Sequence, residues 1–532
     1  MLRARTCTSL FLMCVTIACA AQDDNWNRLL QVHQDFLALH DAGIKDTVHD
    51  FSPAAIQARA AQLGELRSRL HAISPTAWPV AQKVDWVLVR TELNDLDFRY
   101  RVIRPWTRDP SFYLDFFRTL PYGDVPVAPD KRNEFRTQLQ SIPTLLQQAR
   151  KNLNEAGGDL TDIAIFHLEH YDGVGQGEPV RDVPPEGILG WFEDLQSRVR
   201  KQLPELTSDV QQALASIRAY HDWLVTNRTK LNHPDAVGLA EYNWYIKHVR
   251  LMPYTADDLR FIGDAEANRA WTFLKIAQNA NRNLPELQLA KTKEEYDARV
   301  RQAEELIRSF LTENHLLTIP DYVGPQKTDA FWIQRPGGKR HFWEEIQYRD
   351  PLVDHIHASL PGHRLDFLIH EHDTRPIRRD YEDGGRIEGW GFYCEEMLLQ
   401  AGLLRDRPRV RELFYIAQLA RAMRIPVELK IQNGEFSMQQ AIQFMLTNVP
   451  FMDANLARYD LEVYFRQPGY GMNYVAGKRQ IEGLLAARAQ QLGDQFDLGK
   501  FHDRFLAAGM IPVALTEWEM TGTDIDKELD LP

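Results

Sequence analysis

Residues 52–73 read "SPAAIQARAAQLGELRSRLHAI" and set the pattern for most of the chain. Apolar residues recur at intervals of three and four, which places them on one face of an α-helix. Ser52 is a favoured residue just before a helix, and Pro53 is favoured at its first position. The same periodicity recurs through most of the chain up to about residue 318, and again from Pro351 to near Pro512. The sequence therefore predicts a mainly α-helical protein.

The stretch between Thr318 and Arg349 breaks this periodicity. It is rich in proline, glycine and aromatic residues, and residues 331–343 read "FWIQRPGGKRHFW". A Pro-Gly-Gly sequence is typical of a tight turn between two strands. We therefore expect a short β hairpin near residues 330–345. It would lie within one large helical domain at residues 21–532, which has a soft subdivision near residues 230–255.

The bulk composition excludes one class of partner. Of the 532 residues, 44% are hydrophobic, which is enough for a large core. Lys and Arg together number 62 and Asp and Glu 74, for a net charge of -12. Nucleic-acid binding requires a concentrated basic face, so we expect no nucleic-acid partner.

The first twenty residues are typical of a secretory signal peptide. Arg3 and Arg5 precede an apolar run, and "ACA" at residues 18–20 provides small residues for cleavage. The run is too short to span a bilayer, and no later stretch is apolar enough, so we expect no transmembrane segment. We predict a secreted or periplasmic protein. A lipoprotein acylated on Cys19 is the alternative, with "TIAC" as a weak lipidation signal.

Residues 355–396 gather five histidines and several glutamates. His357 and His363 bracket Pro361-Gly362, where a kink would turn both imidazoles toward one point. Glu388 follows on the next predicted helix. Imidazole and carboxylate suit zinc, which catalytic sites usually hold with three protein ligands. The alternative is ordinary interior and capping histidines. "HEHDT" at residues 370–374 is not a zincin helix, because Thr374 stands where the second histidine would be.

Two segments carry a resemblance to a known family. "HASLPGH" at residues 357–363 and "EGWGFYCE" at residues 388–395 are similar, at their spacing, to H-E-x-x-P-G-H and E-G-W-x-x-Y-x-E. These are hallmarks of the domain-of-unknown-function family numbered eight-eight-five, and flanking matches such as "RPWTRDPSFYL" extend the resemblance along the mature chain. The resemblance implies an exported, gluzincin-like helical metallopeptidase fold. It also implies zinc bound by His357, His363 and Glu388.

The chain departs from the family pattern at positions that would perform chemistry. Ala358 stands where the family has the glutamate that accepts a proton from the zinc-bound water. Gln432 stands at a histidine position, Val463 at an arginine position and Tyr470 at a glutamine position. The resemblance leaves as catalytic candidates Tyr393, Glu395, Tyr464 and Lys478, and as substrate-binding candidates Tyr470, Tyr474 and Gln432.

Two functions remain open at this point. The first is a catalytically impaired protein, or pseudoenzyme, whose cleft binds a peptide or a small amide-containing ligand. The alternative is an active zinc-dependent peptidase or amidohydrolase that uses an unusual general base, such as Glu371, His372 or Glu382. Loss of a general base typically costs 10²–10⁴-fold in rate, and loss of an oxyanion donor about 10²–10³-fold more, which favours the first function.

Overall fold

The computed structural model describes residues 6–171, 173–174, 178–179, 181, 183–326 and 332–523. These residues are mainly α-helical and contain no strand, only an isolated bridge between Gly157 and His233. The predicted mainly α-helical class is therefore confirmed. The predicted signal peptide begins in residues 1–5, which lie outside the described residues. Among the described helices, none combines the length and apolar character needed to cross a membrane.

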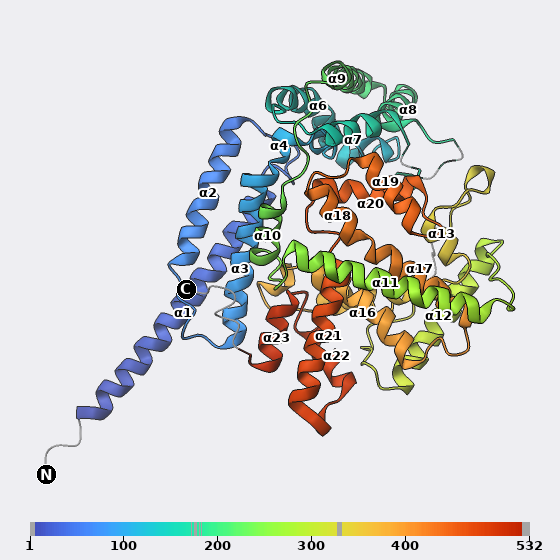
Figure 1. Ribbon diagram of the computed structural model, residues 1–532. Coiled ribbons are helices and arrows are strands. Elements are labelled where there is room, and N and C mark those ends of the chain that lie inside the picture. Colours follow the sequence, from blue (N-terminus) through green and yellow to red (C-terminus); the bar gives the residue numbers. More distant parts are fainter. Residues whose placement is uncertain are drawn as a thin grey trace, which may run out of the picture.

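Three long N-terminal helices pack together along one side of the molecule (Figure 1). Leu29, Trp86 and other buried residues form their core, which also takes in Ile511 and Trp518 from the C-terminal end. Ser52 caps the second helix as predicted, since its side chain accepts a hydrogen bond from the Ala55 amide at 3.3 Å. This group consists of α1 (Thr6–Asp41), α2 (Pro53–His71), α3 (Val80–Phe98) and α23 (Val513–Thr521).

A second group of helices forms one end of the molecule, at the top of Figure 1, around its own apolar core. A one-turn π-helix, η1 (Arg99–Ile103), links it to α3. Its α-helices are α4 (Pro105–Arg108), α5 (Ser111–Leu114), α6 (Arg132–Asn152), α7 (Gly158–Glu169), α8 (Gly187–Gln202) and α9 (Thr207–Asn227). Short 3₁₀ turns lie at η2 (Leu120–Tyr122), η3 (Pro129–Lys131) and η4 (Pro204–Leu206).

The largest core belongs to the C-terminal half of the chain. Two of its helices approach backbone to backbone, because a Cβ atom added at Gly389 would lie only 2.6 Å from Gly477 Cα. The members are α10 (Leu239–His248), α11 (Ala256–Asn281), α12 (Lys293–Glu313), α13 (Phe342–Gln347), α14 (Leu352–Ala358), α15 (His363–His370), α16 (Gly384–Ala401), α17 (Pro408–Ala422), α18 (Arg424–Gln432), α19 (Met438–Asn448), α20 (Ala454–Arg466), α21 (Asn473–Leu492) and α22 (Leu498–Ala507), with 3₁₀ turns η6 (Arg378–Asp380) and η7 (Gly493–Gln495).

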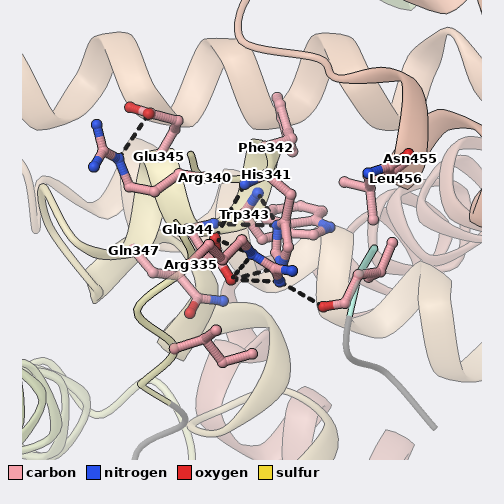
Figure 2. Close-up of polar contacts among 12 residues, drawn as sticks. Arg335, Arg340, His341, Phe342, Trp343, Glu344, Glu345, Gln347, Asn455 and Leu456 are labelled. Atoms are coloured by element: carbon pink, nitrogen blue, oxygen red, sulfur yellow. Dashed lines mark hydrogen bonds and ion pairs between the residues drawn. The ribbon is translucent and has the colours of Figure 1, made fainter. Parts of the chain in front are cut away.

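The predicted β hairpin near residues 330–345 is wrong for the described part of that segment, residues 332–345. Pro336–Gly338 forms a 3₁₀ turn, η5, and α13 begins six residues after Pro336. His341 starts α13 with a reciprocal capping box, in which Glu344 accepts from the His341 amide at 3.1 Å. Arg335 reaches the same carboxylate at 2.8 Å (Figure 2). The polar groups near the turn are thus satisfied by side chains, and they form no strand ladder.

Candidate metal centre

Three side chains from three helices converge on one point. His357 lies in the last turn of α14, His363 is the first residue of α15, and Glu388 lies in the second turn of α16. Glu388 Oε2 is 3.2 Å from His357 Nε2 and 3.3 Å from His363 Nε2, and the possible ligand atoms all lie within 4.8 Å of one another. Ligands of a tetrahedral zinc ion at 2.0–2.1 Å are separated by about 3.3 Å, so the donor spacing suits such an ion.

The break between α14 and α15 brings the two imidazoles together. The chain turns back at Gly362, where an added Cβ would lie 1.8 Å from the His357 carbonyl oxygen. The Trp390 indole of α16 donates a hydrogen bond to the Pro361 carbonyl at 2.9 Å. A buried pair between Arg386 and Asp366, with N–O distances of 2.7 and 3.0 Å, fastens α15 to α16. The position of His363 relative to Glu388 is therefore set by contacts that lie outside the cluster itself.

The far side of the His357 ring is held by an acid. Its Nδ1 lies 2.8 Å from Glu395 Oε1, and Arg421 Nη2 lies 3.1 Å from the same oxygen. Gly391 leaves room for the ring, since an added Cβ would lie 2.7 Å from His357 Cε1. A histidine whose second nitrogen faces a carboxylate is the usual arrangement at protein metal sites, because the acid fixes the tautomer and raises the basicity of the ligand nitrogen.

The charges of the cluster are strongly coupled. Burial raises the pKa of Glu388, but the hydrogen bonds from His357 and His363 outweigh it and hold that pKa well below its ordinary value. Burial and the Arg421 guanidinium lower the pKa of His357, yet Glu388 and Glu395 raise it above its ordinary value. The carboxylate is therefore anionic and attracts cations. A divalent ion and protons compete for the same nitrogen atoms.

A cavity of about 340 Å³ opens onto these three residues. Its walls combine tyrosine and tryptophan side chains with acids and arginines, and the Tyr470 hydroxyl donates to Glu388 Oε1 at 3.3 Å. Arg424 lies over the Tyr474 ring at 4.3 Å and binds Asp460 at 2.8 Å. Val463 also lines the cavity, so the aliphatic side chain faces it where the family pattern has an arginine. The cavity combines aromatic surface with arginine side chains that are already paired with carboxylates.

The predicted catalytic and substrate-binding residues divide into two sets. Tyr464, Tyr470 and Tyr474 line the cavity, and Glu395 lies behind His357. The other three point elsewhere. The Tyr393 hydroxyl meets His502 Nε2 at 2.8 Å, Lys478 binds Glu266 at 2.7 Å, and buried Gln432 accepts from the Val237 amide at 3.1 Å and donates to the Tyr464 carbonyl at 2.7 Å.

The alternative bases do not reach the cluster either. Glu371, His372 and Glu382 are exposed, and none of them lines the cavity. Asp354 and Asp460 are the cavity's own aspartates. Burial raises the pKa of Asp354, which lies one turn before His357 on α14.

Sequence reasoning missed Arg421, Arg424, Asp354 and Trp343, all of which line the cavity. A signal was present, because both arginines interrupt the otherwise apolar run "YIAQLARAMRIPV" at residues 415–427. Charged residues inside a buried helix must be paired, so they indicate a polar site.

A family of bacterial proteins of unknown function, DUF885, matches residues 35–272 and 264–520. The chain belongs to this family. Among curated proteins, none matches the chain.

Two solved structures share the DUF885 chain's fold. One is a candidate lipoprotein of unknown function from Shewanella oneidensis, 17% identical, with a TM-score of 0.72 over 94% of this chain and 98% of that one. The other is a candidate lipoprotein from Colwellia psychrerythraea, 16% identical, with a TM-score of 0.66 over 94% and 99%.

Proposed function

We propose that this DUF885 protein is an exported, metallopeptidase-like protein that binds zinc and captures a peptide or small amide without efficiently cleaving it. One observation carries the proposal. A three-ligand cluster of His357, His363 and Glu388 opens onto a cavity, while the residue beside the first histidine is Ala358. Export rests on the N-terminal sequence, which has the charged start, apolar run and small residues of a signal peptide.

The donor set favours zinc over harder ions. Two imidazoles and one carboxylate are a common set of protein ligands at catalytic zinc sites, whereas calcium and magnesium select oxygen ligands. The contact of Glu395 with His357 supports the same assignment. His363 Nδ1 is buried without a hydrogen-bond partner among the described residues, while its Nε2 faces Glu388 at 3.3 Å, which leaves the ring's polar atoms available to an ion at the cluster.

Zinc in such a site supplies a Lewis acid that polarises a carbonyl oxygen and acidifies a bound water. The side chains around the cluster then determine whether a bound amide is only held or also hydrolysed. The aromatic walls at Tyr464 and Tyr474 provide apolar contact for a ligand. The methyl group of Ala358 can neither accept a proton nor pass it to a leaving amine, and this loss alone costs about 10²–10⁴-fold in rate. Arg424 is held by Asp460, so it is not free to follow a developing oxyanion.

A second candidate is an active peptidase or amidohydrolase. The observation that favours it is Asp354, a cavity carboxylate whose pKa is raised by burial, as is common for a general base. If Asp354 were the base, hydrolysis would be chelator-sensitive and Asp354→Asn would abolish it.

The test begins with zinc content. We expect about one zinc per purified mature chain, lost in His357→Ala and retained in His372→Ala, an exposed histidine that serves as the matched control. Zinc-loaded protein should bind acetylated tripeptides while releasing little or no product. Robust hydrolysis that a chelator stops would refute the binding function and favour the second candidate. Absence of zinc at micromolar free metal would refute the site.

A further inference from the structure

A second cavity, of about 360 Å³, shares the lining residue Tyr470 with the first. It is formed by the end of α3, the π-helix η1, the start of α5 and residues 466–470. Tyr470 lines both cavities, and its hydroxyl is 3.3 Å from Glu388. Tyr470 therefore belongs to the lining of both cavities, and an extended ligand that passes this side chain would contact both.

Five arginines line the two cavities, and four of them are already paired with carboxylates. The pairs are Arg421 with Glu395 at 3.1 Å, Arg424 with Asp460 at 2.8 Å, Arg250 with Asp383 at 3.4 Å, and Arg466 with Asp109 at 2.6 Å. Arg99 is the exception: among the described residues it has no hydrogen-bonding or ion-pairing partner for its guanidinium. Asp95, one turn earlier on α3, lines the same cavity and attracts the Arg99 guanidinium at longer range, but the two do not form a direct ion pair.

The backbone at Arg99 is irregular, which is unusual within a long helix. Its carbonyl accepts from the Arg104 amide at 2.8 Å, a π-type bond, and Arg104 itself has a positive φ of 42°. Single-turn π segments are frequent at functional sites, because they re-aim a side chain. Burial lowers the pKa of the Arg99 guanidinium and outweighs the attraction of Asp95 and Asp115 across the cavity, so the group is partly desolvated without a directly bonded carboxylate.

We infer that Arg99 anchors a free carboxylate of the ligand whose amide lies at the metal cavity; the inference rests on the function proposed above. A planar guanidinium binds a carboxylate through two parallel N–H···O bonds. Asp95, Asp109 and Asp115 line the same cavity. Their repulsion is stronger for a doubly charged phosphate than for a singly charged carboxylate, so the carboxylate is the favoured anion. The ligand class is a short peptide with a free C-terminus, and Tyr470 lies between its two ends.

The experiment compares two probes that differ only in the anchored group. N-acetyl-trialanine and its C-terminal amide are titrated into the zinc-loaded full chain by calorimetry. We expect the acid to bind about 10- to 100-fold more tightly than the amide, as is typical of a charge-assisted pair. Arg99→Gln should reduce that ratio to near one by weakening the acid only. Arg99→Lys should keep part of the preference, and Asp95→Asn should keep or increase it.

The controls separate this inference from the zinc proposal. Arg101→Gln alters the same π-helix outside the cavity, where Arg101 binds Glu241 at 2.7 Å, and should keep the full preference. Thermal unfolding and zinc content should be unchanged in every Arg99 variant. Equal binding of acid and amide, or a preference that survives in Arg99→Gln, overturns the anchor but leaves the zinc site standing. Conversely, if the natural protein takes up no zinc and still prefers the acid over the amide, the anchor is supported and the metal site is refuted.

Discussion

Replacing Glu395 by glutamine tests whether the acid behind His357 tunes a metal ligand. The side chain is completely buried, and its Oε1 lies 2.8 Å from His357 Nδ1 and 3.1 Å from Arg421 Nη2. Glutamine keeps the size and one acceptor oxygen but removes the charge that makes His357 a better donor. Loss of such a partner typically weakens metal affinity 10–100-fold. Since each tenfold change is worth about 1.4 kcal/mol, we expect zinc binding to weaken by about 1.4–2.7 kcal/mol.

The assay is competition for zinc against a chromophoric chelator of known affinity, at constant pH and ionic strength. The neighbouring residue supplies the matched control, because Glu396 lies on the same helix but binds Arg269 at 2.6 Å, away from the cluster. Glu396→Gln should leave zinc affinity unchanged. Equal zinc affinity in Glu395→Gln and the natural protein would contradict the proposed role. It would mean that the contact seen at His357 serves packing or the Arg421 charge instead.

Three further outcomes are expected. Gly391→Ala places a methyl group 2.7 Å from His357 Cε1, so zinc stoichiometry should fall while the helical circular dichroism is retained; full occupancy would disprove the close fit. Ala358→Glu adds an acid at an exposed position beside His357. The rate of peptide hydrolysis, measured with a quenched peptide library, should rise above background but stay well below that of an efficient peptidase. Burial raises the pKa of Glu304, but the bond from His355 at 2.5 Å, together with that from Arg308 at 2.7 Å, outweighs it and lowers the pKa to about 2. The resulting stability, about 3 kcal/mol, is present above the unfolded pKa near 4.5 and lost as pH falls through about 2. Glu304→Gln should flatten the pH dependence of denaturant unfolding in that window, and an unchanged slope would count against the pair.

The sequence predicted the helices because their signals are local. Apolar spacing and the cap at Ser52 involve residues within a few turns of one another, and the structure retains both. The hairpin prediction failed because a Pro-Gly-Gly turn is compatible with more than one continuation. What decided it was the capping box between His341 and Glu344, which starts a helix where a second strand was expected.

The candidate site was predictable only in part, for a related reason. The family resemblance named His357, His363 and Glu388, and the structure brings these three together. The arginines of the cavities were not predicted, because their partners are distant in the chain. Arg424 binds Asp460 from the next helix but one, and Arg421 of α17 binds Glu395 of α16. Pairing across helices leaves little periodic trace in a sequence.

The departures from the family pattern are not equivalent, and the structure distinguishes between them. Ala358 is exposed and next to a ligand, so restoring an acid there disturbs little packing. Gln432 is fully buried and uses both ends of its amide, accepting from the Val237 backbone and donating to the Tyr464 backbone. A histidine at that position would leave at least one of these buried groups unpaired, at a cost of about 1–3 kcal/mol. Gln432 therefore links two backbone segments of the fold, and a histidine placed there would require Val237 and Tyr464 to find new partners. This structural use of Gln432 supports the proposed binding function, because the position that holds a histidine in the family pattern here joins two backbone segments.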